Sequence, residues 1–420
     1  MTSLPPAAPA SRLARELTTT DAVVLGLGAM VGAGIFAVIG PAVAIAGSGA
    51  LPALLLAAVV AYCNATSSAQ LAALHPESGG AYVYGRQRLG PFWGYLAGWG
   101  FVVGKLASCT AMALTFASYA APALMRPLAV TAVLLLTAVN LFGIRKTALL
   151  TRLIVAVVLL ALAAVIVAVL LGGEVSLARL TAEQPWRPRP ILQAAGLWFF
   201  AFSGYARLAT LGEEVVDPAR TLPRAIPLAL GIALALYFSV ALCALLAVDA
   251  GELGRAAAPL VAAVQAGRLA SWSPIVRLGA AVASLGVLLS LIAGVSRTGF
   301  AMAANGDLPR PLAVVHPRYK VPQRAELAAG LIVAVLVSLS DLRSAIGFSA
   351  FTVLLYYGVT NAAALRLAPA ERRWPRGLAV GGLLGCVLLA FSLPWPSVLG
   401  GLLVLAVGAA LHAARRPAPA

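Results

Sequence analysis

A cluster of glycines lies inside a long apolar segment that carries no charged side chain. The segment runs from residue 22 to residue 71; Gly28, Gly32 and Gly34 fall near its start, and Pro41 follows them. A membrane span normally keeps its helical hydrogen bonds, because lipid offers the backbone no other partners. Glycine and proline favour an interruption, which is tolerated only where the freed backbone lines a cavity. The sequence therefore predicts a broken helix at bilayer depth, where transporters hold their substrates.

The whole chain has the composition of a membrane protein. Its 420 residues are 61% hydrophobic and 10% charged, and apolar runs of about 20 residues, enough to cross a hydrocarbon core, recur along it. We predict an all-α membrane protein with twelve transmembrane helices, preceded by a polar cytoplasmic tail over residues 1–18 that is not a signal peptide. The expected spans are 19–47, 50–74, 92–119, 125–143, 149–172, 189–212, 222–248, 274–302, 323–340, 344–366, 376–393 and 396–413.

The distribution of basic residues predicts the orientation. With the N-terminus inside, 20 of the 30 Lys and Arg residues lie in inner segments, 8 lie in outer segments, and 2, Lys105 and Arg207, lie within spans. Cytoplasmic segments carry an excess of basic residues, so both termini are expected in the cytoplasm, with the protein in the inner membrane. The net charge of +16 is then explained by orientation and lipid headgroups, and nucleic acid is not an expected partner.

A second interruption is expected five spans after the first. Ser203 and Gly204 lie in the middle of the apolar stretch 198–205. Interrupted spans at matching positions of two halves are typical of inverted-repeat transporters. We therefore predict a first repeat over residues 19–172, a second over 189–366, and two appended helices over 376–413.

The two interruptions predict a site for a zwitterion. Unwinding at Gly32 and Gly34 would leave backbone N–H groups and the positive end of a helix dipole, which suit a carboxylate. Unwinding around Phe202, Ser203 and Gly204 would leave carbonyl groups, which accept hydrogen bonds from an ammonium group. Together these groups describe an α-amino acid. The competing interpretation is that the glycines are small-residue motifs for helix packing.

Lys105 and Arg207 are the basic residues that lie within spans and are not counted with the inner or outer segments. A lysine near mid-bilayer costs several kcal/mol, so it should face an interior partner or water. Lys105 is either a coupling cation or a structural lysine that donates to freed carbonyls. Arg207 does not deprotonate, so it would bind an anionic group or pair with Glu213 or Glu214.

Other chemistry is weakly supported. The Asp and Glu residues lie in the tail, in loops or near span ends, and the histidines His75, His316 and His412 do too. The four cysteines lie in apolar segments without a ligand spacing. We predict no enzymatic activity, no cofactor and no metal site.

Several motifs resemble the amino acid–polyamine–organocation superfamily of secondary transporters across nearly the whole chain. The resemblance implies a fold of five plus five helices with helices 1 and 6 broken, working by alternating access. The motifs that carry it are residues Gly32–Phe36, Pro76–Tyr84, Phe200–Gly204, Glu213–Glu214, Asp217–Pro223 and Ser296–Pro309.

The resemblance also implies the residues of the site. The substrate carboxylate would lie against Gly32, Ala33 and Gly34, and its amino group against the carbonyls of Met30 and of Phe200 or Ser203. Phe200 and Phe202 would flank the site, and Ser290 or Leu291 would face the substrate side chain. The chain departs from similar proton-coupled transporters that carry a lysine in span 5, because its span 5 is aliphatic around Val158.

We therefore predict a secondary active transporter of amino acids, coupled by proton symport or by exchange. Sodium is less expected, because a hard cation needs several oxygen ligands and span 8 lacks adjacent hydroxyl residues. Few polar side chains surround the expected pocket, which favours a neutral or apolar amino acid, while Lys105 and Arg207 leave an anionic substrate open. A membrane receptor that has kept a transporter fold, and a channel, are the alternatives; the oligomeric state is not predicted.

Overall fold

The computed structural model describes residues 17–32, 34–75, 79–143, 148–173, 175–181, 187–205, 208 and 215–415. The described residues are mainly helical, with one isolated parallel β-bridge between Leu17 and Val215. The helices, with 3₁₀ helices marked η, are α1 (Thr19–Met30), α2 (Gly34–Ala46), η1 (Gly47–Gly49), α3 (Ala50–Leu74), α4 (Ala81–Arg88), α5 (Pro91–Ala120), η2 (Pro122–Leu124), α6 (Met125–Leu141), α7 (Ala148–Gly172), α8 (Ala178–Thr181), α9 (Pro188–Phe202), η3 (Ser203–Tyr205), α11 (Pro218–Ala247), α12 (Ala250–Arg255), α13 (Pro259–Gln265), η4 (Ala270–Trp272), α14 (Ser273–Ala304), η5 (Arg310–Leu312), α15 (Gln323–Leu339), α16 (Leu342–Leu365), η6 (Pro369–Glu371), α17 (Arg376–Ser392) and α18 (Trp395–Arg415).

Helices occupy the ranges in which the apolar runs predicted spans. The helix α3 coincides with the expected span 50–74, and α7 begins one residue before the expected 149. Within the described ranges, eight helical stretches are long and apolar enough to cross a membrane, and α1 and α17 are shorter apolar helices. The prediction of an all-helical protein with many membrane-spanning segments is confirmed.

The first interruption falls between α1 and α2. At the start of α1, the Thr18 hydroxyl accepts from the Asp21 backbone N–H, and the Asp21 carboxylate accepts from the Thr18 backbone N–H, which forms a capping box. The helix ends at Met30, and α2 begins at Gly34. The chain between them contains Gly32, so the helix ends where the cluster of glycines predicted an interruption.

The second interruption follows α9. The α-helix ends at Phe202 and tightens into the 3₁₀ turn η3, which contains Ser203 and Gly204. A 3₁₀ turn replaces the i→i−4 bonds of an α-helix with i→i−3 bonds of poorer geometry. Regular α-helix therefore stops at both positions where the sequence predicted a break.

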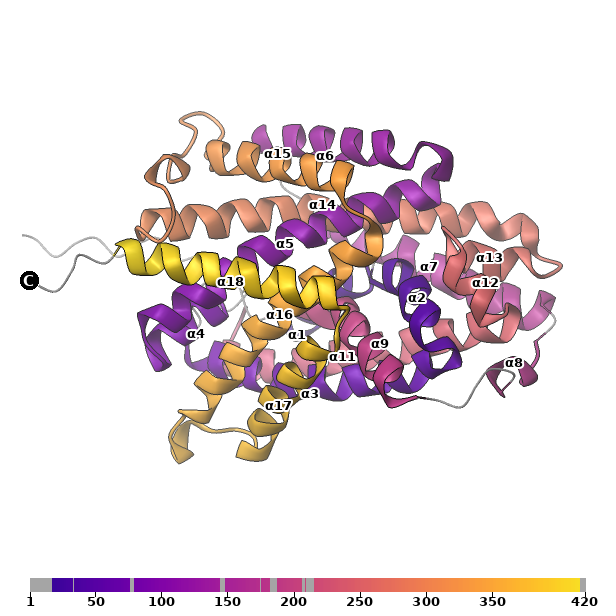
Figure 1. Ribbon diagram of the computed structural model, residues 1–420, viewed down its shortest axis with the longest axis horizontal. Coiled ribbons are helices and arrows are strands. Elements are labelled where there is room, and N and C mark those ends of the chain that lie inside the picture. Colours follow the sequence, from indigo (N-terminus) through magenta and orange to yellow (C-terminus); the bar gives the residue numbers. More distant parts are fainter. Residues whose placement is uncertain are drawn as a thin grey trace, which may run out of the picture.

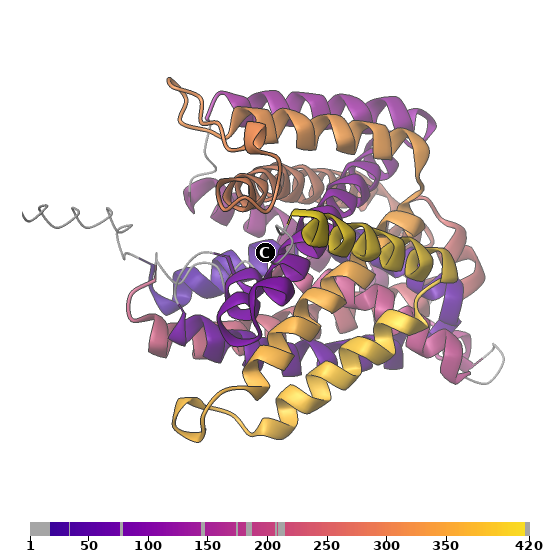
Figure 2. The same cartoon turned by 60° about the vertical axis from the view of Figure 1, so that its left-hand side comes forward.

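The long helix α5 lies in the middle of the bundle. It packs against α14 on one side and α16 on another, and α4 covers its first turns. The pair α6 and α15 lies side by side along one edge of the molecule in both views (Figures 1 and 2). The last helices are peripheral: α17 packs against α3 and α16, and α18 runs across α5 and α16 (Figure 1). The helix α9 packs against both α2 and α3, so the two interrupted helices adjoin.

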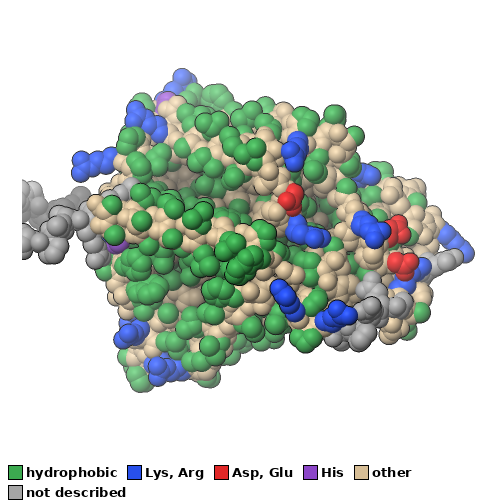
Figure 3. Space-filling model, viewed as in Figure 1, with side chains coloured by type: hydrophobic (Ala, Val, Ile, Leu, Met, Phe, Trp, Pro, Cys, Tyr) green, Lys and Arg blue, Asp and Glu red, His purple; other side chains and the backbone are tan. Residues whose placement is uncertain are grey.

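The surface is that of a protein in contact with lipid. Large apolar side chains are exposed on many helices, for example Leu160 on α7, Leu331 on α15 and Leu384 on α17. On the face shown in Figure 3, a broad band without Lys, Arg, Asp or Glu separates the charged side chains at the left from those at the right. An apolar band of this kind on a soluble protein would be an aggregation hazard, whereas in a bilayer it faces hydrocarbon.

Candidate functional site

The two interrupted helices approach each other through glycines. A Cβ atom added to Gly34 would lie 2.7 Å from the Cα atom of Ala201, and one added to Gly204 would lie 2.7 Å from the backbone nitrogen of Met30. Both distances are shorter than the about 3.5–4.0 Å at which two carbon atoms attract each other best. A side chain at Gly34 would therefore push α2 and α9 apart, and one at Gly204 would push the turn η3 away from the end of α1.

Tyr237 of α11 joins the ends of α1 and α9 through its hydroxyl group. The side chain is fully buried, and its hydroxyl oxygen lies 2.6 Å from the carbonyl oxygen of Met30 and 3.2 Å from that of Ala201. Both carbonyls belong to the last turn of a helix, where no later N–H of the same helix is in position to pair with them. A hydroxyl from a third helix thus lies within hydrogen-bonding reach of a backbone carbonyl at each interruption.

The turn after α9 is held by two further hydroxyl groups. The Ser203 hydroxyl donates to the carbonyl of Phe200 at 2.8 Å, and the Tyr357 hydroxyl of α16 donates to the carbonyl of Ser203 at 3.3 Å. The ring of Tyr205 contacts that of Tyr357 with 4.8 Å between centroids, and the ring of Phe202 contacts that of Tyr237 with 5.3 Å between centroids. Side-chain hydroxyl groups therefore bind the carbonyls of Phe200 and Ser203 in this turn.

Val287 of α14 is the residue whose side chain lies against Gly32 at the first interruption. A Cβ atom added to Gly32 would clash with the Val287 side chain. Ser290 is exposed and donates to the carbonyl of Gly286 at 3.0 Å, while Leu291 is half-buried. The two expected contacts with a substrate side chain thus lie about one helical turn beyond the α14 residue that touches Gly32.

Lys105 lies at the middle of α5. Its side chain is 7% exposed, and its ammonium nitrogen lies 5.7 Å from the centroid of the Phe101 ring, in the range of a cation–π contact.

Two predicted site residues, Ala33 and Arg207, lie outside the described residues, as do Glu213 and Glu214.

A small cavity of about 10 Å³ lies between α1 and α7, beside the first interruption. This is about the volume that one water molecule needs. Only glycine and aliphatic residues line this cavity: Leu27, Gly28, Val31, Gly32, Ile154, Val155 and Val158. Val158 marks the middle of span 5, the span in which similar proton-coupled transporters carry a lysine. No side-chain oxygen lines this space, which makes it a poor place for a hard cation.

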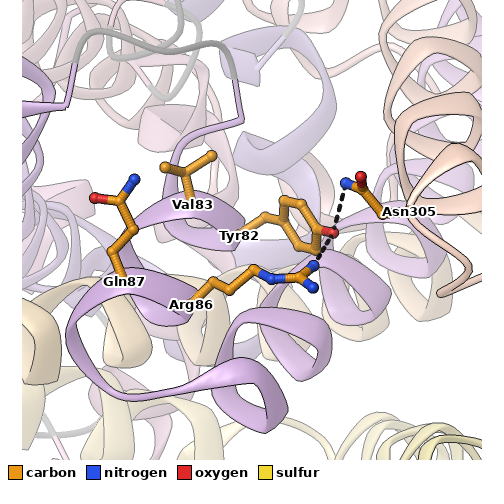
Figure 4. Close-up of a pocket in the computed structure, with 5 residues that line it drawn as sticks. All are labelled: Tyr82, Val83, Arg86, Gln87 and Asn305. Atoms are coloured by element: carbon orange, nitrogen blue, oxygen red, sulfur yellow. Dashed lines mark hydrogen bonds between the residues drawn. The ribbon is translucent and has the colours of Figure 1, made fainter. Parts of the chain in front are cut away.

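A polar cluster lies away from the interruptions, where α4 meets the end of α14 (Figure 4). The Tyr82 hydroxyl donates to the Asp307 carboxylate at 2.7 Å and accepts from Arg86 at 2.7 Å and from Asn305 at 3.0 Å. Burial and the Asp307 carboxylate raise the pKa of Tyr82 above its ordinary value. A cavity of about 220 Å³ opens beside Tyr82, Val83, Arg86, Gln87 and Asn305, and it contains none of the predicted site residues.

The other end of α4 is tied to η6. Two guanidinium nitrogens of Arg88 donate to the two carboxylate oxygens of Glu371, at 3.1 and 2.8 Å. These hydrogen bonds hold the pKa of Glu371 below its ordinary value. The short helix α4 is therefore fastened at both ends.

The sequence alone did not reveal Tyr237, Tyr357 or Val287. Each stands in an apolar span without a charge or a motif around it, and its partners come from helices far away in the chain. A buried tyrosine hydroxyl usually finds a hydrogen-bond partner, which is the signal that could have marked the two tyrosines.

Comparison with known proteins places this arrangement in a family. Residues 17–411 match the family model described as "Amino acid permease". The chain belongs to the amino acid permease family. This family lies within the superfamily that the motifs predicted, and membership indicates a multi-pass membrane transporter rather than an enzyme.

Three similar proteins illustrate the range of this permease family. An "Uncharacterized transporter" of Mycobacterium tuberculosis is 59% identical over 404 residues, which cover 96% of this chain and 92% of that protein. A "Serine/threonine exchanger" of Bacillus subtilis is 30% identical, covering 82% of this chain and 81% of that protein. A "Branched-chain amino acid permease" of the same organism is 25% identical, covering 95% and 92%.

Proposed function

We propose that this permease carries amino acids across the cytoplasmic membrane by alternating access. The observation that supports this most is the close approach of the two interrupted helices at Gly34 and Gly204. The substrate carboxylate binds the N–H groups at the start of α2, and its ammonium binds the carbonyls of Met30 and Phe200 or Ser203. Helix dipoles reinforce both contacts, because α2 presents its positive end and α1 and α9 present their negative ends.

The hydroxyl of Tyr237 does not prevent an ammonium group from using the Met30 carbonyl. A carbonyl oxygen has two lone pairs, and Tyr237 uses one of them. Tyr237 therefore holds the carbonyl in place, and the second lone pair is left for the substrate.

The proposal extends to the architecture. We propose twelve transmembrane helices and a cytoplasmic location for both termini. The helices α1 and α2 together form one broken span, and α9 begins the second broken span. The two repeats are residues 19–172 and 189–366, and residues 376–413 are appended. Movement of the broken helices against the rest of the bundle would open the site to each side in turn.

Coupling by proton symport or by exchange completes the proposal. The aliphatic lining of the cavity around Val158 supports this choice over sodium, because sodium would need oxygen ligands. Lys105 is the buried cation that could carry the proton, and Arg207 remains a second candidate that binds an anionic group.

Thermal stabilisation of the purified protein by the twenty amino acids tests this function. A ligand that binds only the folded state at 100 times its Kd stabilises that state by about 2.7 kcal/mol. Amino acids that stabilise the protein should then accumulate in vesicles that contain it when a pH gradient or an internal amino acid is supplied. Stabilisation without flux would favour a sensor, and no stabilisation by any amino acid would refute the site.

A further inference from the structure

A stripe of accessible residues runs along one face of α14. Its members recur every three or four positions, as residues on one face of a helix do: Ser290, Arg297, Ala301 and Asn305 are exposed, and Val287 and Gly294 are half-buried. A Cβ atom added to Gly294 would meet nothing within 4 Å. Most of these side chains are small or polar, whereas the exposed residues Ile275 and Leu278 nearer the start of α14 are large and apolar. The stripe therefore suits water better than lipid.

The two ends of this stripe are different places in the molecule. It begins at the first interruption, where Val287 lies against Gly32, and it ends at Asn305, which lines the cavity of about 220 Å³ beside α4. Residues 287 and 305 are 18 positions apart, which corresponds to about 27 Å along a helix. No single amino acid spans that distance, so a molecule in the cavity is separate from one at the interruptions. In the proposed orientation, the cavity lies at the cytoplasmic end of α14.

Arg86 is held in a fixed orientation at this cavity (Figure 4). Its Nη1 nitrogen donates to the Tyr82 hydroxyl at 2.7 Å and to the Asp307 carboxylate at 3.3 Å, and its guanidinium carbon lies 5.8 Å from the centroid of the Tyr82 ring. Both hydrogen bonds use the same nitrogen, and no hydrogen bond to another described residue uses Nε or Nη2. The N–H groups on that edge of the guanidinium are parallel and match the two oxygens of a carboxylate.

Charge and size decide which ligand fits this cavity. Arg86 and Asp307 carry one positive and one negative charge, 3.3 Å apart. A phosphate dianion would bring a second negative charge near Asp307, where like charges repel, whereas a zwitterion adds no net charge. The volume of about 220 Å³ is more than ten times the about 10–15 Å³ that one water molecule needs. The cavity therefore has room for a whole amino acid.

We propose that this cavity is a second amino acid site, in which Arg86 binds the α-carboxylate of an amino acid on the cytoplasmic side. The inference rests on the proposed function, which supplies the orientation in the membrane and the class of ligand. The nearby Asp307 carboxylate balances the ammonium group of the same molecule. A cytosolic amino acid held there is the counter-substrate that enters along the stripe of α14 during exchange.

Protection of an introduced thiol tests the inference. The native cysteines are all buried, so Gln87→Cys places one reactive thiol in the lining of the cavity. Its labelling by a water-soluble maleimide is timed on the purified protein with each of the nineteen amino acids that lack a thiol, with the amino alcohol of any that protects, and with inorganic phosphate. We expect at least one amino acid to slow labelling by about threefold or more. The amino alcohol, which has no carboxylate, and phosphate should not slow it.

Matched variants separate the cavity from its surroundings. Val315→Cys places a thiol on an exposed loop residue outside the cavity, and its labelling should not respond to amino acids. Combining Arg86→Gln with Gln87→Cys should raise the half-protecting concentration by about tenfold or more, because a charge-assisted hydrogen-bond pair is lost. Arg86→Lys keeps the charge without the fork and should have a smaller effect. The comparison of amino acid with amino alcohol leaves Arg86 unchanged, so it holds even if Arg86→Gln does not fold.

The outcomes separate this inference from the proposed function. Gly34→Val should abolish uptake at the interruptions, yet protection of the thiol at position 87 should persist in it, because the cavity is a separate site. Protection that disappears in Gly34→Val, equal protection by phosphate, or protection by no amino acid would overturn the second site and leave amino acid transport standing. Failure of the wild-type protein to carry any amino acid into vesicles would refute the proposed function instead, whatever the thiol labelling shows.

Discussion

Replacing Gly34 with alanine tests the contact between the interrupted helices. The added Cβ atom would lie 2.7 Å from the Cα atom and 2.9 Å from the Cβ atom of Ala201. Non-bonded carbon atoms in van der Waals contact are about 3.5–4.0 Å apart, so α2 and α9 must separate by about 1 Å. The atom that blocks the methyl group is backbone, which cannot rotate away as a side chain can.

The expected cost follows from this displacement. Overpacking of a closely packed interior destabilises a protein by about 1–3 kcal/mol. If the same displacement pulls the peptide groups of the site away from a substrate, the loss in affinity is about 5–150-fold. We therefore expect Gly34→Ala to raise the KM for uptake by at least about tenfold and to lower the unfolding temperature, and Gly34→Val to abolish uptake while the protein still inserts.

Gly231→Ala is the matched control. Gly231 lies within α11, and a Cβ atom there meets nothing within 4 Å. Alanine in a helix is more stable than glycine by roughly 0.5–1 kcal/mol, so this variant should be slightly stabilised and should transport normally. Uptake is measured in vesicles and unfolding in detergent for both variants. Wild-type KM and unfolding temperature in Gly34→Ala would refute the reasoning that the two backbones meet at this glycine.

Three other outcomes follow from the described contacts. Tyr237→Phe removes the hydroxyl that binds the carbonyls of Met30 and Ala201, so binding should weaken by about 1–3 kcal/mol, as measured by substrate-induced thermal stabilisation; unchanged stabilisation would count against the bridge. Glu371 has a lowered pKa because Arg88 binds its carboxylate, so its contribution to stability is present above its ordinary pKa of 4.5 and is lost as the pH falls through the lowered value. The unfolding temperatures of Glu371→Gln and wild type should therefore differ at pH 7 and converge in acid, and a difference that persists at low pH would contradict this assignment. Uptake should proceed without sodium and should increase when the outside is acidified; a strict sodium requirement would refute the coupling choice.

The helices were predictable from the sequence because lipid imposes a length on each apolar run. The ends of α3 and α14 follow the runs closely, and the ends of α1 and α9 follow the glycines at positions 32 and 204. The rotation of each helix about its own axis, which decides which residues face the interruptions, was less predictable. In span 8, Ser290 or Leu291 was expected to face the substrate side chain, and that prediction stands untested. Val287, about one helical turn earlier, is the residue that lies against Gly32.

Long-range hydrogen bonds could not be predicted from one sequence. The Tyr237 hydroxyl binds a carbonyl 207 residues earlier in the chain and another 36 residues earlier. The sequence around a tyrosine in an apolar span contains no local pattern that predicts such distant hydrogen-bond partners. Lys105 was conspicuous in the sequence as a charge in a span, and Phe101 lies one turn earlier on the same helix. The contact of Phe101 with Tyr356, by contrast, depends on how α5 and α16 pack.

The hydroxyl of Tyr237 has one hydrogen atom, although two carbonyl oxygens lie within its reach. A phenol donates only one hydrogen bond at a time, so the ends of α1 and α9 together are short of a donor. In the proposed function, an arriving ammonium would bring three donors and remove that shortage. Part of the affinity would then be independent of the ligand's side chain, because the acceptors at this junction are backbone carbonyls.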